Sequence, residues 1–268
     1  MVMFNQITPV YPHKLRRLYG PFLTLAESYR TVVGTVAGSF GLGENRYTIP
    51  RFTFLGPEIG MPQKRIGLFG LLHGDEAACA QALLKLLQTL ADQPELAKGY
   101  DLVVYPVCNP TGYEDDTRHN RSGADLNREF WRNSSQPEVK ILEEELRTQN
   151  FDGIIALHAD DTCDGLYGYS HGRVENENLL LPALQASSQI LPLDLRTMID
   201  GFSARDGIVC DCFPGILSPA PDIKPRPFEI IFETPARALP VQQAAAAHVA
   251  LLSILSSYRS LISYAQNL

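Results

Sequence analysis

Short apolar runs, separated by stretches of helical or irregular pattern, organise the chain from residue 64 onward. The runs are rich in Ile, Leu, Val and Phe with few polar interruptions, which is typical of strands buried on both faces. Four strands are predicted in this way, over residues 66–72, 102–105, 154–157 and 228–232. We therefore expect a sheet whose inner strands are covered on both sides.

Helical spacing of apolar residues predicts the elements between these strands. A first helix is expected over residues 77–91. A second should follow the capping-box pattern Ser-Gln-Pro-Glu at residues 135–138, which places a proline just inside the helix start. Pro240 should open the last helix. Residues 21–33 are expected to form a further helix beside one or two edge strands, and residues 201–227, rich in Pro and Gly, a long excursion.

This alternation predicts an α/β fold with a mixed, mostly parallel sheet and helices on both faces. No internal repeat or low-complexity linker interrupts the 268 residues. Because α/β folds often reach about 250 residues as a single unit, we expect residues 1–268 to form one domain.

Composition narrows the classes of partner. The chain has 23 Lys and Arg against 30 Asp and Glu, a net charge of −7, which argues against binding a nucleic-acid backbone. No segment approaches the ~20 continuous apolar residues of a membrane span, so no membrane contact is expected. The first 20 residues place basic residues after apolar ones, the reverse of a signal peptide.

The cysteines fit a cytoplasmic location, because five of them at irregular spacing do not form a disulfide framework. Cys210 and Cys212 could be half of a zinc site. A second Cys or His pair at ligand spacing is missing from the sequence, so we interpret them as buried or incidental thiols.

Polar side chains that could bind a metal or take part in catalysis follow three of the predicted strands. His73 and Glu76 come after the first strand, His158 ends the third, and Glu233 ends the fourth. The carboxyl ends of parallel strands share one edge of a sheet, where the ligand sites of open α/β folds lie. We therefore expect these four side chains to converge.

His73, Glu76 and His158 have the composition of a catalytic zinc site. The H-x-x-E spacing lets the first two reach one ion, and three N/O ligands leave a position for water, whose pKa the ion would lower toward ~7. Taken singly, His73 could be a turn residue and His158 a core histidine. Their joint position at strand ends favours one bound zinc ion.

Two further motifs resemble the signature of the zinc carboxypeptidase family. Asn109-Pro-Thr-Gly112 matches its N-P-x-G element, and residues 118–130, RHNRSGADLNREF, match R-x-N-x-x-G-x-D-L-N-R-x-F. With H-x-x-E, a strand-end His and a strand-end Glu, all five elements occur in order, over roughly residues 50–240. The resemblance implies a carboxypeptidase-like (phosphorylase/hydrolase-like) fold and a metallopeptidase activity.

The resemblance also implies roles for individual residues. His73, Glu76 and His158 would be the zinc ligands, and Arg118 would polarise the scissile carbonyl. Asn127 and Arg128 would bind the substrate carboxylate, and Glu233 would be the general base. Elementary chemistry agrees, because a guanidinium captures carboxylates or stabilises an oxyanion and a carboxylate relays protons. Arg121 is the second choice for the role of Arg118, and Glu229 for that of Glu233.

The sequence departs from the digestive members of this family in the substrate pocket. Those members carry a substrate-capping tyrosine in the loop before the final strand, whereas Tyr167 and Tyr169 follow His158 closely and the later loop has none. Arg205 lies where the family places the residue at the base of the side-chain pocket. There it would favour an acidic substrate side chain; the alternative is a surface arginine.

His-Gly-Asp-Glu at residues 73–76 also resembles succinylglutamate desuccinylase and aspartoacylase, which remove an acyl group from an amino acid. Those enzymes typically carry a β-rich domain after the catalytic glutamate, whereas the residues after Glu233 are expected to form one helix. We therefore favour a zinc-dependent metallocarboxypeptidase or peptide amidase cleaving next to a free carboxylate. An N-acyl amino acid deacylase and a non-catalytic zinc-binding relative are the alternatives, and the expected partner is a peptide or N-acyl amino acid.

Overall fold

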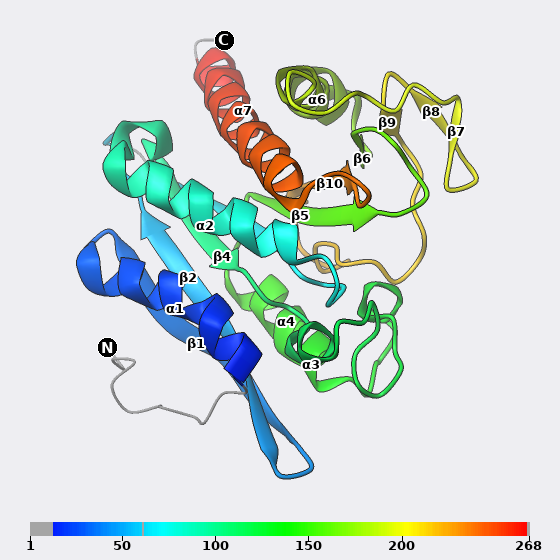
Figure 1. The fold of residues 1–268 in the computed structure, drawn as a ribbon. Coiled ribbons are helices and arrows are strands. Elements are labelled where there is room, and N and C mark those ends of the chain that lie inside the picture. Colours follow the sequence, from blue (N-terminus) through cyan, green and yellow to red (C-terminus); the bar gives the residue numbers. More distant parts are fainter. Residues whose placement is uncertain (1–12, 61, 267–268) are drawn as a thin grey trace.

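The computed structural model describes residues 13–60 and 62–266, and Figure 1 shows their arrangement. In chain order the elements are α1 (His13–Ser28), β1 (Val32–Leu42), β2 (Asn45–Leu55), β3 (Lys64–Phe69), α2 (Ala77–Asp92), η2 (Pro94–Ala97), β4 (Tyr100–Tyr105), α3 (Pro110–Asp115), η3 (Leu126–Arg128), α4 (Pro137–Thr148), β5 (Gly153–Asp160), β6 (Tyr167–Tyr169), α5 (Arg173–Glu175), η4 (Asn176–Leu180), α6 (Leu181–Ser187), β7 (Met198–Ile199), β8 (Phe202–Arg205), β9 (Ile208–Val209), β10 (Phe228–Pro235) and α7 (Pro240–Gln266).

The described strands form one mixed sheet in the order β1-β2-β4-β3-β5-β10-β6-β9-β8-β7. Its centre is parallel, since β4, β3, β5 and β10 run in the same direction. Both flanks are mainly antiparallel: β1 and β2 form a hairpin at one edge, and β7, β8 and β9 form short pairs at the other. The predicted α/β class is confirmed, but the expectation of a mostly parallel sheet is wrong: parallel pairing is concentrated where the four predicted strands lie, and the hairpin and short strands on both flanks make most of the remaining pairs antiparallel.

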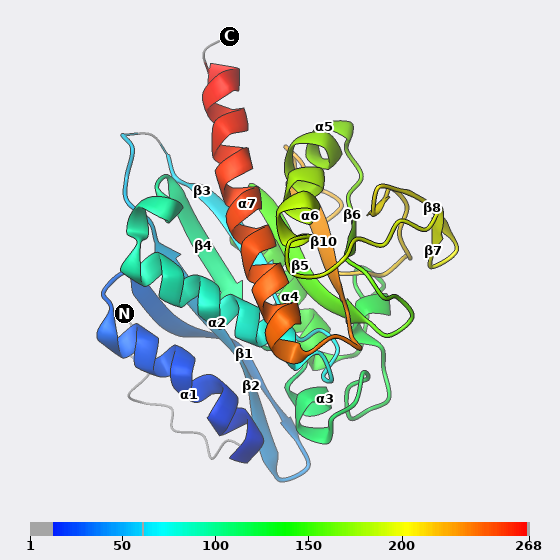
Figure 2. The ribbon, with the colours of Figure 1, turned by 45° about the horizontal axis from the view of Figure 1, so that its top comes forward.

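Helices cover both faces of the sheet (Figures 1 and 2). Helices α1, α2, α6 and α7 pack on one face, and α4 packs on the other. Side chains along β10 alternate between the two faces of the sheet. Phe228, Ile230 and Phe232 join the core beneath α7, while Ile231 joins a different cluster on the opposite face. Complete burial of one leucine or phenylalanine contributes roughly 1.5–3 kcal/mol, so these clusters are the main source of stability.

The helix predicted over residues 77–91 is confirmed as α2, and the helix opened by Pro240 is confirmed as α7. The capping box at the start of α4 does not form: Gln136 is the N-cap residue, without a side-chain capping bond. The Glu138 carboxylate instead accepts hydrogen bonds from Thr111 and Asn120. Tertiary contacts thus replace the local pattern.

The predicted helix over residues 21–33 is wrong in position. Helix α1 ends at Ser28, and Val32 already begins β1, which with β2 provides the predicted edge strands. Pro21 lies inside α1 rather than at its start. The helix tolerates it because Leu15, Tyr19 and Phe22, at helical spacing, are buried in the core and hold both sides of the proline in place. The expectation that the chain begins without a signal peptide rests mostly on residues 1–12, which lie outside the described residues.

Helix α7 is long and apolar enough to cross a membrane, judged by length and composition over Pro240–Tyr264. A single helix of this kind is weak evidence, because a helix of a globular protein can pass the same test; 33% of the window is buried here. Polar contacts also tie α7 to the rest of the fold. Among them, Ser187 Oγ donates to Ala246 O, Tyr100 OH donates to Leu255 O, and Thr89 Oγ1 lies 3.0 Å from His248 Nε2.

Candidate metal centre and active site

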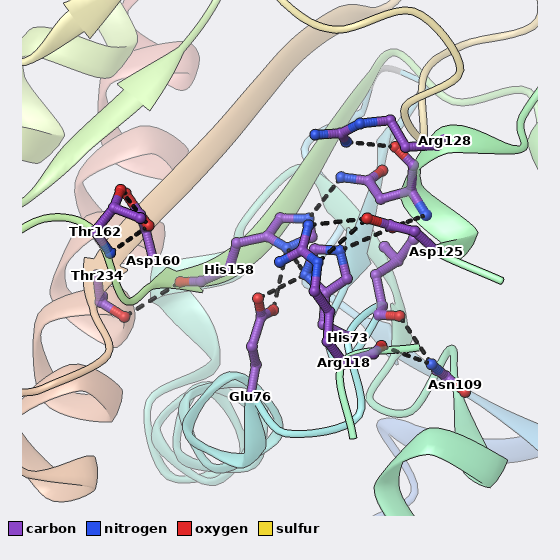
Figure 3. Close-up of polar contacts among 12 residues, drawn as sticks. His73, Glu76, Asn109, Arg118, Asp125, Arg128, His158, Asp160, Thr162 and Thr234 are labelled. Carbon is purple, nitrogen blue, oxygen red and sulfur yellow. Dashed lines mark hydrogen bonds and ion pairs between the residues drawn. The ribbon is translucent and has the colours of Figure 1, made fainter. Parts of the chain in front are cut away.

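The three strand-end residues meet at one edge of the parallel sheet. His73 follows β3, while His158 and Glu233 lie near the ends of β5 and β10. The last two are register partners on adjacent parallel strands, so their side chains project from the same face. Figure 3 shows His73, Glu76 and His158 pointing toward one another. The predicted convergence is thus present in the structure.

A close approach of three loops fixes the position of the H-x-x-E segment. Gly74 N donates to Arg118 O at 3.3 Å, and a Cβ atom at Gly74 would lie 2.0 Å from the backbone of Gly112. Asn109 holds the same junction, since its Nδ2 donates to Leu72 O and Arg118 O and its Oδ1 accepts from Gly112 N. The N-P-x-G motif therefore acts here as a structural clamp behind the site.

The ligand atoms of His73, Glu76 and His158 lie within 4.8 Å of one another, and all three side chains are buried. The two Nδ1 atoms are 3.2 Å apart, and Glu76 oxygens lie 2.6 Å from His73 Nδ1 and 3.1 Å from His158 Nδ1. Ligand atoms about 2.0–2.2 Å from a tetrahedral zinc ion are about 3.3–3.6 Å apart, close to this spacing. The group is therefore fit to hold a metal ion with two imidazoles and a carboxylate.

Charge coupling within this group also favours a cation. Although burial favours the neutral acid, the charges of His158 and His73 lower the pKa of Glu76. Burial likewise opposes a charge on His73, but Glu76 and hydrogen bonds to Asp125 and Glu76 raise its pKa. Burial lowers the pKa of His158. A bound metal would replace the proton that His73 otherwise carries beside the Glu76 carboxylate.

Asp125 is a site residue that the sequence analysis did not assign. Its Oδ1 lies 3.2 Å from His73 Nε2, while its Oδ2 accepts from Arg118 Nε and Nη2 at 3.2 and 3.1 Å. A carboxylate on the far nitrogen of a ligand histidine fixes the ring tautomer, so that His73 Nδ1 faces the metal position. The aspartate of the D-L-N-R motif was the signal that could have identified it.

The structure separates Arg118 from Arg121. Arg118 lines the cavity beside the ligand group, and its Nη1 makes no hydrogen bond to the described protein atoms. Arg121 instead bonds to Asp115, Glu114 and the Tyr47 hydroxyl away from that cavity. This placement favours Arg118 over Arg121 for contact with a substrate.

Asn127 and Arg128 both line the cavity, but their side chains are engaged differently. Asn127 Oδ1 accepts from Leu217 N at 2.8 Å, and its Nδ2 lies 3.4 Å from His158 Nε2, so the amide braces protein groups. The Arg128 guanidinium lies 4.3 Å from the Phe213 ring centre and has no carboxylate partner among the described residues. Arg128 is thus the arginine available to bind an anion.

Glu233 lines the same cavity and makes no hydrogen bond with the described residues. Burial raises its pKa well above the ordinary value, and the negative charges of Glu76, Asp160 and Asp200 act in the same direction, with Arg118 opposing them. A carboxylate with a raised pKa is a stronger base once ionised. Glu229, the second choice, does not line this cavity.

Part of the cavity wall is acidic, and two tyrosines bond to its aspartates. Tyr167 OH donates to Asp160 at 3.0 Å, and Tyr169 OH donates to Asp200 at 2.7 Å. Both tyrosines are nearly fully buried, and their rings contact each other edge to face with centres 5.6 Å apart. Both hydroxyl groups are thus bonded to carboxylates of the protein itself.

The prediction that Arg205 lies at the base of the substrate pocket is contradicted. Its side chain is 93% exposed and pairs with the adjacent Asp206, outside the cavity. The reason is its location on β8, a short strand between β9 and β7 whose alternate residues, including residue 205, are exposed. Six of the predicted site residues line the cavity: His73, Glu76, Arg118, Asn127, Arg128 and Glu233. His158 joins them through its contacts with His73 and Glu76.

Comparison with known proteins agrees with this geometry. Residues 62–167 match the family model of the succinylglutamate desuccinylase/aspartoacylase catalytic domain, a segment that contains all the predicted site residues except Arg205 and Glu233. Among curated proteins, none matches the chain.

Several solved structures share the fold. A metallopeptidase candidate from Shewanella denitrificans aligns with a TM-score of 0.76 and 21% identity, covering 90% of this chain and 89% of the other. The metallo-carboxypeptidase of Burkholderia cenocepacia aligns at 0.72 and 16% identity over 93% and 70% of the two chains. Carboxypeptidase A of Helicoverpa armigera aligns at 0.69 and 18% identity over 95% and 74%. The predicted family resemblance is thus confirmed: the chain has a metallocarboxypeptidase-like fold and carries a segment similar to the succinylglutamate desuccinylase/aspartoacylase catalytic domain.

Proposed function

We propose that the protein is a zinc-dependent hydrolase that cleaves a peptide or amide bond next to a free carboxylate. The observation that carries this proposal is one cavity at the His-Glu-His ligand group that also holds the carboxylate of Glu233 and the guanidinium of Arg128, which has no carboxylate partner among the described residues. Each group suits one part of amide hydrolysis: metal binding, proton transfer and recognition of an anion.

His73, Glu76 and His158 would hold the zinc ion, which supplies a Lewis acid and a water molecule of lowered pKa when bound. Glu233 would accept the proton of the attacking water at its carboxylate and pass it to the leaving nitrogen. Its raised pKa suits both steps, because the protonated form must persist long enough to act as an acid.

Arg118 and Arg128 would act at two ends of the scissile unit. Asp125 orients Arg118 through Nε and Nη2, which leaves Nη1 to donate to the oxygen that gains negative charge in the transition state. Arg128 would bind the substrate carboxylate through its planar guanidinium, supported by the ring of Phe213. Asn127 would position His158 and residue 217 rather than bind the carboxylate itself.

The acidic wall favours a substrate with a cationic group. Asp160, Asp161 and Asp200 line the cavity, whereas Arg205, the basis for expecting an acidic side chain, does not. An ammonium or guanidinium group of the substrate would lie against this wall while its carboxylate binds Arg128. We therefore replace the expected acidic preference with a cationic one.

An N-acyl amino acid deacylase is the second candidate, and the match of residues 62–167 to a deacylase-containing family model favours it. The two activities use the same metal, base and arginines and differ in the acyl portion of the substrate. Both release an amine next to a carboxylate.

A hydrolysis panel with metal added back after chelation tests the proposal. It would contain peptides ending in Lys, Leu and Glu, their C-terminal amides, and N-acetyl and N-succinyl amino acids. Turnover of the free peptides supports the peptidase, and turnover of only the N-acyl amino acids supports the deacylase. A full complement of metal without any turnover would overturn both and support a non-catalytic relative.

A further inference from the structure

A second cavity lies at the opposite end of β10 from Glu233. Strands β6 and β10 are antiparallel, with Tyr169 opposite Ile231, so the residues that follow β6 lie near the start of β10. The cavity has a volume of about 220 Å³ and is lined by Ser170, His171, Gly172, Glu175, Arg226, Pro227, Phe228 and Glu229. None of these residues lines the catalytic cavity, so the two spaces have separate walls.

Two polar atoms in this cavity are buried without a partner among the described residues. Glu229 is 7% exposed and its Oε1 makes no hydrogen bond, and Ser170, which is 1% exposed, has an unpaired Oγ. Burial raises the pKa of the Glu229 carboxyl, and the charges of His171 and Arg226 oppose this only in part. Buried polar atoms are nearly always paired, so these two indicate a ligand that donates hydrogen bonds and carries positive charge.

Arg226 supplies hydrogen-bond donors beside this carboxylate. Its Nη2 donates to Glu229 Oε2 at 3.3 Å, and its other N–H groups bond to none of the described residues. The side chain of Arg226 is 55% exposed, so it lies toward solvent while Glu229 forms the floor of the cavity. Open donors and an open acceptor thus lie on two groups in direct contact. An α-amino acid has the complementary arrangement, because its ammonium and its carboxylate are attached to one carbon atom.

The rest of the lining fits the side chain of such a ligand. Pro227 and Phe228 are buried and apolar. The carboxylate of Glu175 has no partner among the described residues, and it lies over Gly172, where a Cβ atom would be 1.6 Å from Glu175 Oε2. This carboxylate would repel an acidic side chain. The cavity is also smaller than the roughly 300–1,000 Å³ of pockets for drug-sized ligands, which suits a molecule of amino-acid size.

We propose that this cavity binds a free α-amino acid with a neutral or basic side chain. The ligand ammonium would donate to Glu229 Oε1 and Ser170 Oγ, and the ligand carboxylate would accept from the open N–H groups of Arg226. The ligand side chain would lie against Pro227 and Phe228. This site goes beyond the proposed hydrolase function and does not depend on it.

Isothermal titration calorimetry of the full-length Arg128→Ala variant tests this proposal, because that change weakens carboxylate binding in the catalytic cavity. L-Leucine should bind at one site per chain. Two analogues, 4-methylpentanoate without the ammonium and leucinamide without the carboxylate, should each bind at least ten-fold more weakly, since each loses hydrogen bonds to a charged group. L-Glutamate should bind several-fold more weakly than L-leucine because of Glu175.

Variants made in the same background assign the binding to this cavity. Glu229→Gln, which preserves shape, should weaken leucine binding at least ten-fold. Arg226→Ala should weaken the binding of leucine but not that of leucinamide, a difference that a general loss of structure would not produce. The controls Glu44→Gln and Arg237→Ala change an exposed glutamate and an exposed arginine elsewhere and should keep the affinity for leucine. Circular dichroism should show that every variant is folded.

Absence of leucine binding in the Arg128→Ala variant would overturn the proposal, as would equal affinities for leucine and 4-methylpentanoate. Undiminished leucine binding in Glu229→Gln would do the same. Leucine binding at this cavity in a protein whose wild type hydrolyses no member of the substrate panel would instead contradict the proposed function alone.

Discussion

Asp125 joins His73 and Arg118 through its two carboxylate oxygens, one on the ligand histidine and one on the arginine. The orientation of the metal ligand and the position of the oxyanion-binding arginine therefore depend on one side chain. Such partners of ligand histidines typically contribute a factor of about 10–100 to metal affinity or activity.

Asp125→Ala should therefore weaken zinc binding by about 10–100-fold and lower kcat even at saturating zinc, because Arg118 also loses its anchor. Competition with a chromophoric chelator would measure the affinity. Asp115→Ala, which removes a partner of Arg121 instead, should leave zinc affinity unchanged. Equal affinities for the Asp125 variant and the wild type would contradict the role of the carboxylate.

Glu233→Gln should retain the metal and lose turnover by about 100-fold or more, because the amide cannot accept the proton of the attacking water. Metal analysis and steady-state kinetics on one preparation would check both parts. Glu44→Gln, in the exposed turn between β1 and β2, serves as the control. Wild-type turnover in the Glu233 variant would exclude it as the base.

Arg128→Ala should raise KM for substrates with a free carboxylate by roughly 10- to 100-fold, since hydrogen bonds to a charged group contribute about 1.5–3 kcal/mol. The variant should also discriminate poorly between a peptide and its C-terminal amide. Arg205→Ala is the matched control, because its exposed side chain lies outside the cavity and its loss should not change KM. A raised KM in Arg205→Ala together with an unchanged KM in Arg128→Ala would instead indicate that Arg205 binds the substrate.

Asp200→Asn should reduce the preference for C-terminal Lys over Leu by a factor of a few. The effect is modest because an exposed ion pair contributes about 0.2–1 kcal/mol. The ratio of kcat/KM for the two substrates is the measurement. A preference for C-terminal Glu in the wild-type enzyme would refute the cationic substrate class.

Glu138→Gln should increase the free energy of unfolding at pH 7. Burial raises the pKa of Glu138, so its protonated form stabilises the fold below the unfolded-state pKa of about 4.3, and this contribution is lost as pH rises through the higher folded-state pKa. Glutamine is neutral throughout, so the advantage of the variant should shrink as pH falls below about 4. Urea denaturation at pH 7 and at a pH below about 4 would measure the difference in free energy of unfolding between the variant and the wild type.

Strand-level features could be predicted because they depend on local composition and one topological rule. Buried parallel strands are continuous apolar runs, and their carboxyl ends meet, which is sufficient to place His73, His158 and Glu233 at one edge of the sheet. The family motif then supplied Arg118, Asn127 and Arg128. These residues do lie together at the site.

Features that depend on long-range packing could not be predicted in the same way. The D-L-N-R motif could mark Asp125 as a site residue, but its pairing with His73 spans 52 residues and no local pattern indicates that contact. Arg205 was misplaced because the irregular segment around it has no periodicity from which to infer its direction. Ser135 resembles a helix cap, but Glu138 pairs instead with Thr111 and Asn120, which precede it by 27 and 18 residues.

Gly74 determines which parts of this scaffold can be exchanged. Its missing side chain lets the ligand loop rest on the backbone of Gly112, and Asn109 fastens both to the segment that begins at Arg118. These loops therefore form one inseparable unit for protein engineering. A graft that transfers His73 and Glu76 to another host without residues 109–118 would carry the ligands but not the surface that aims them.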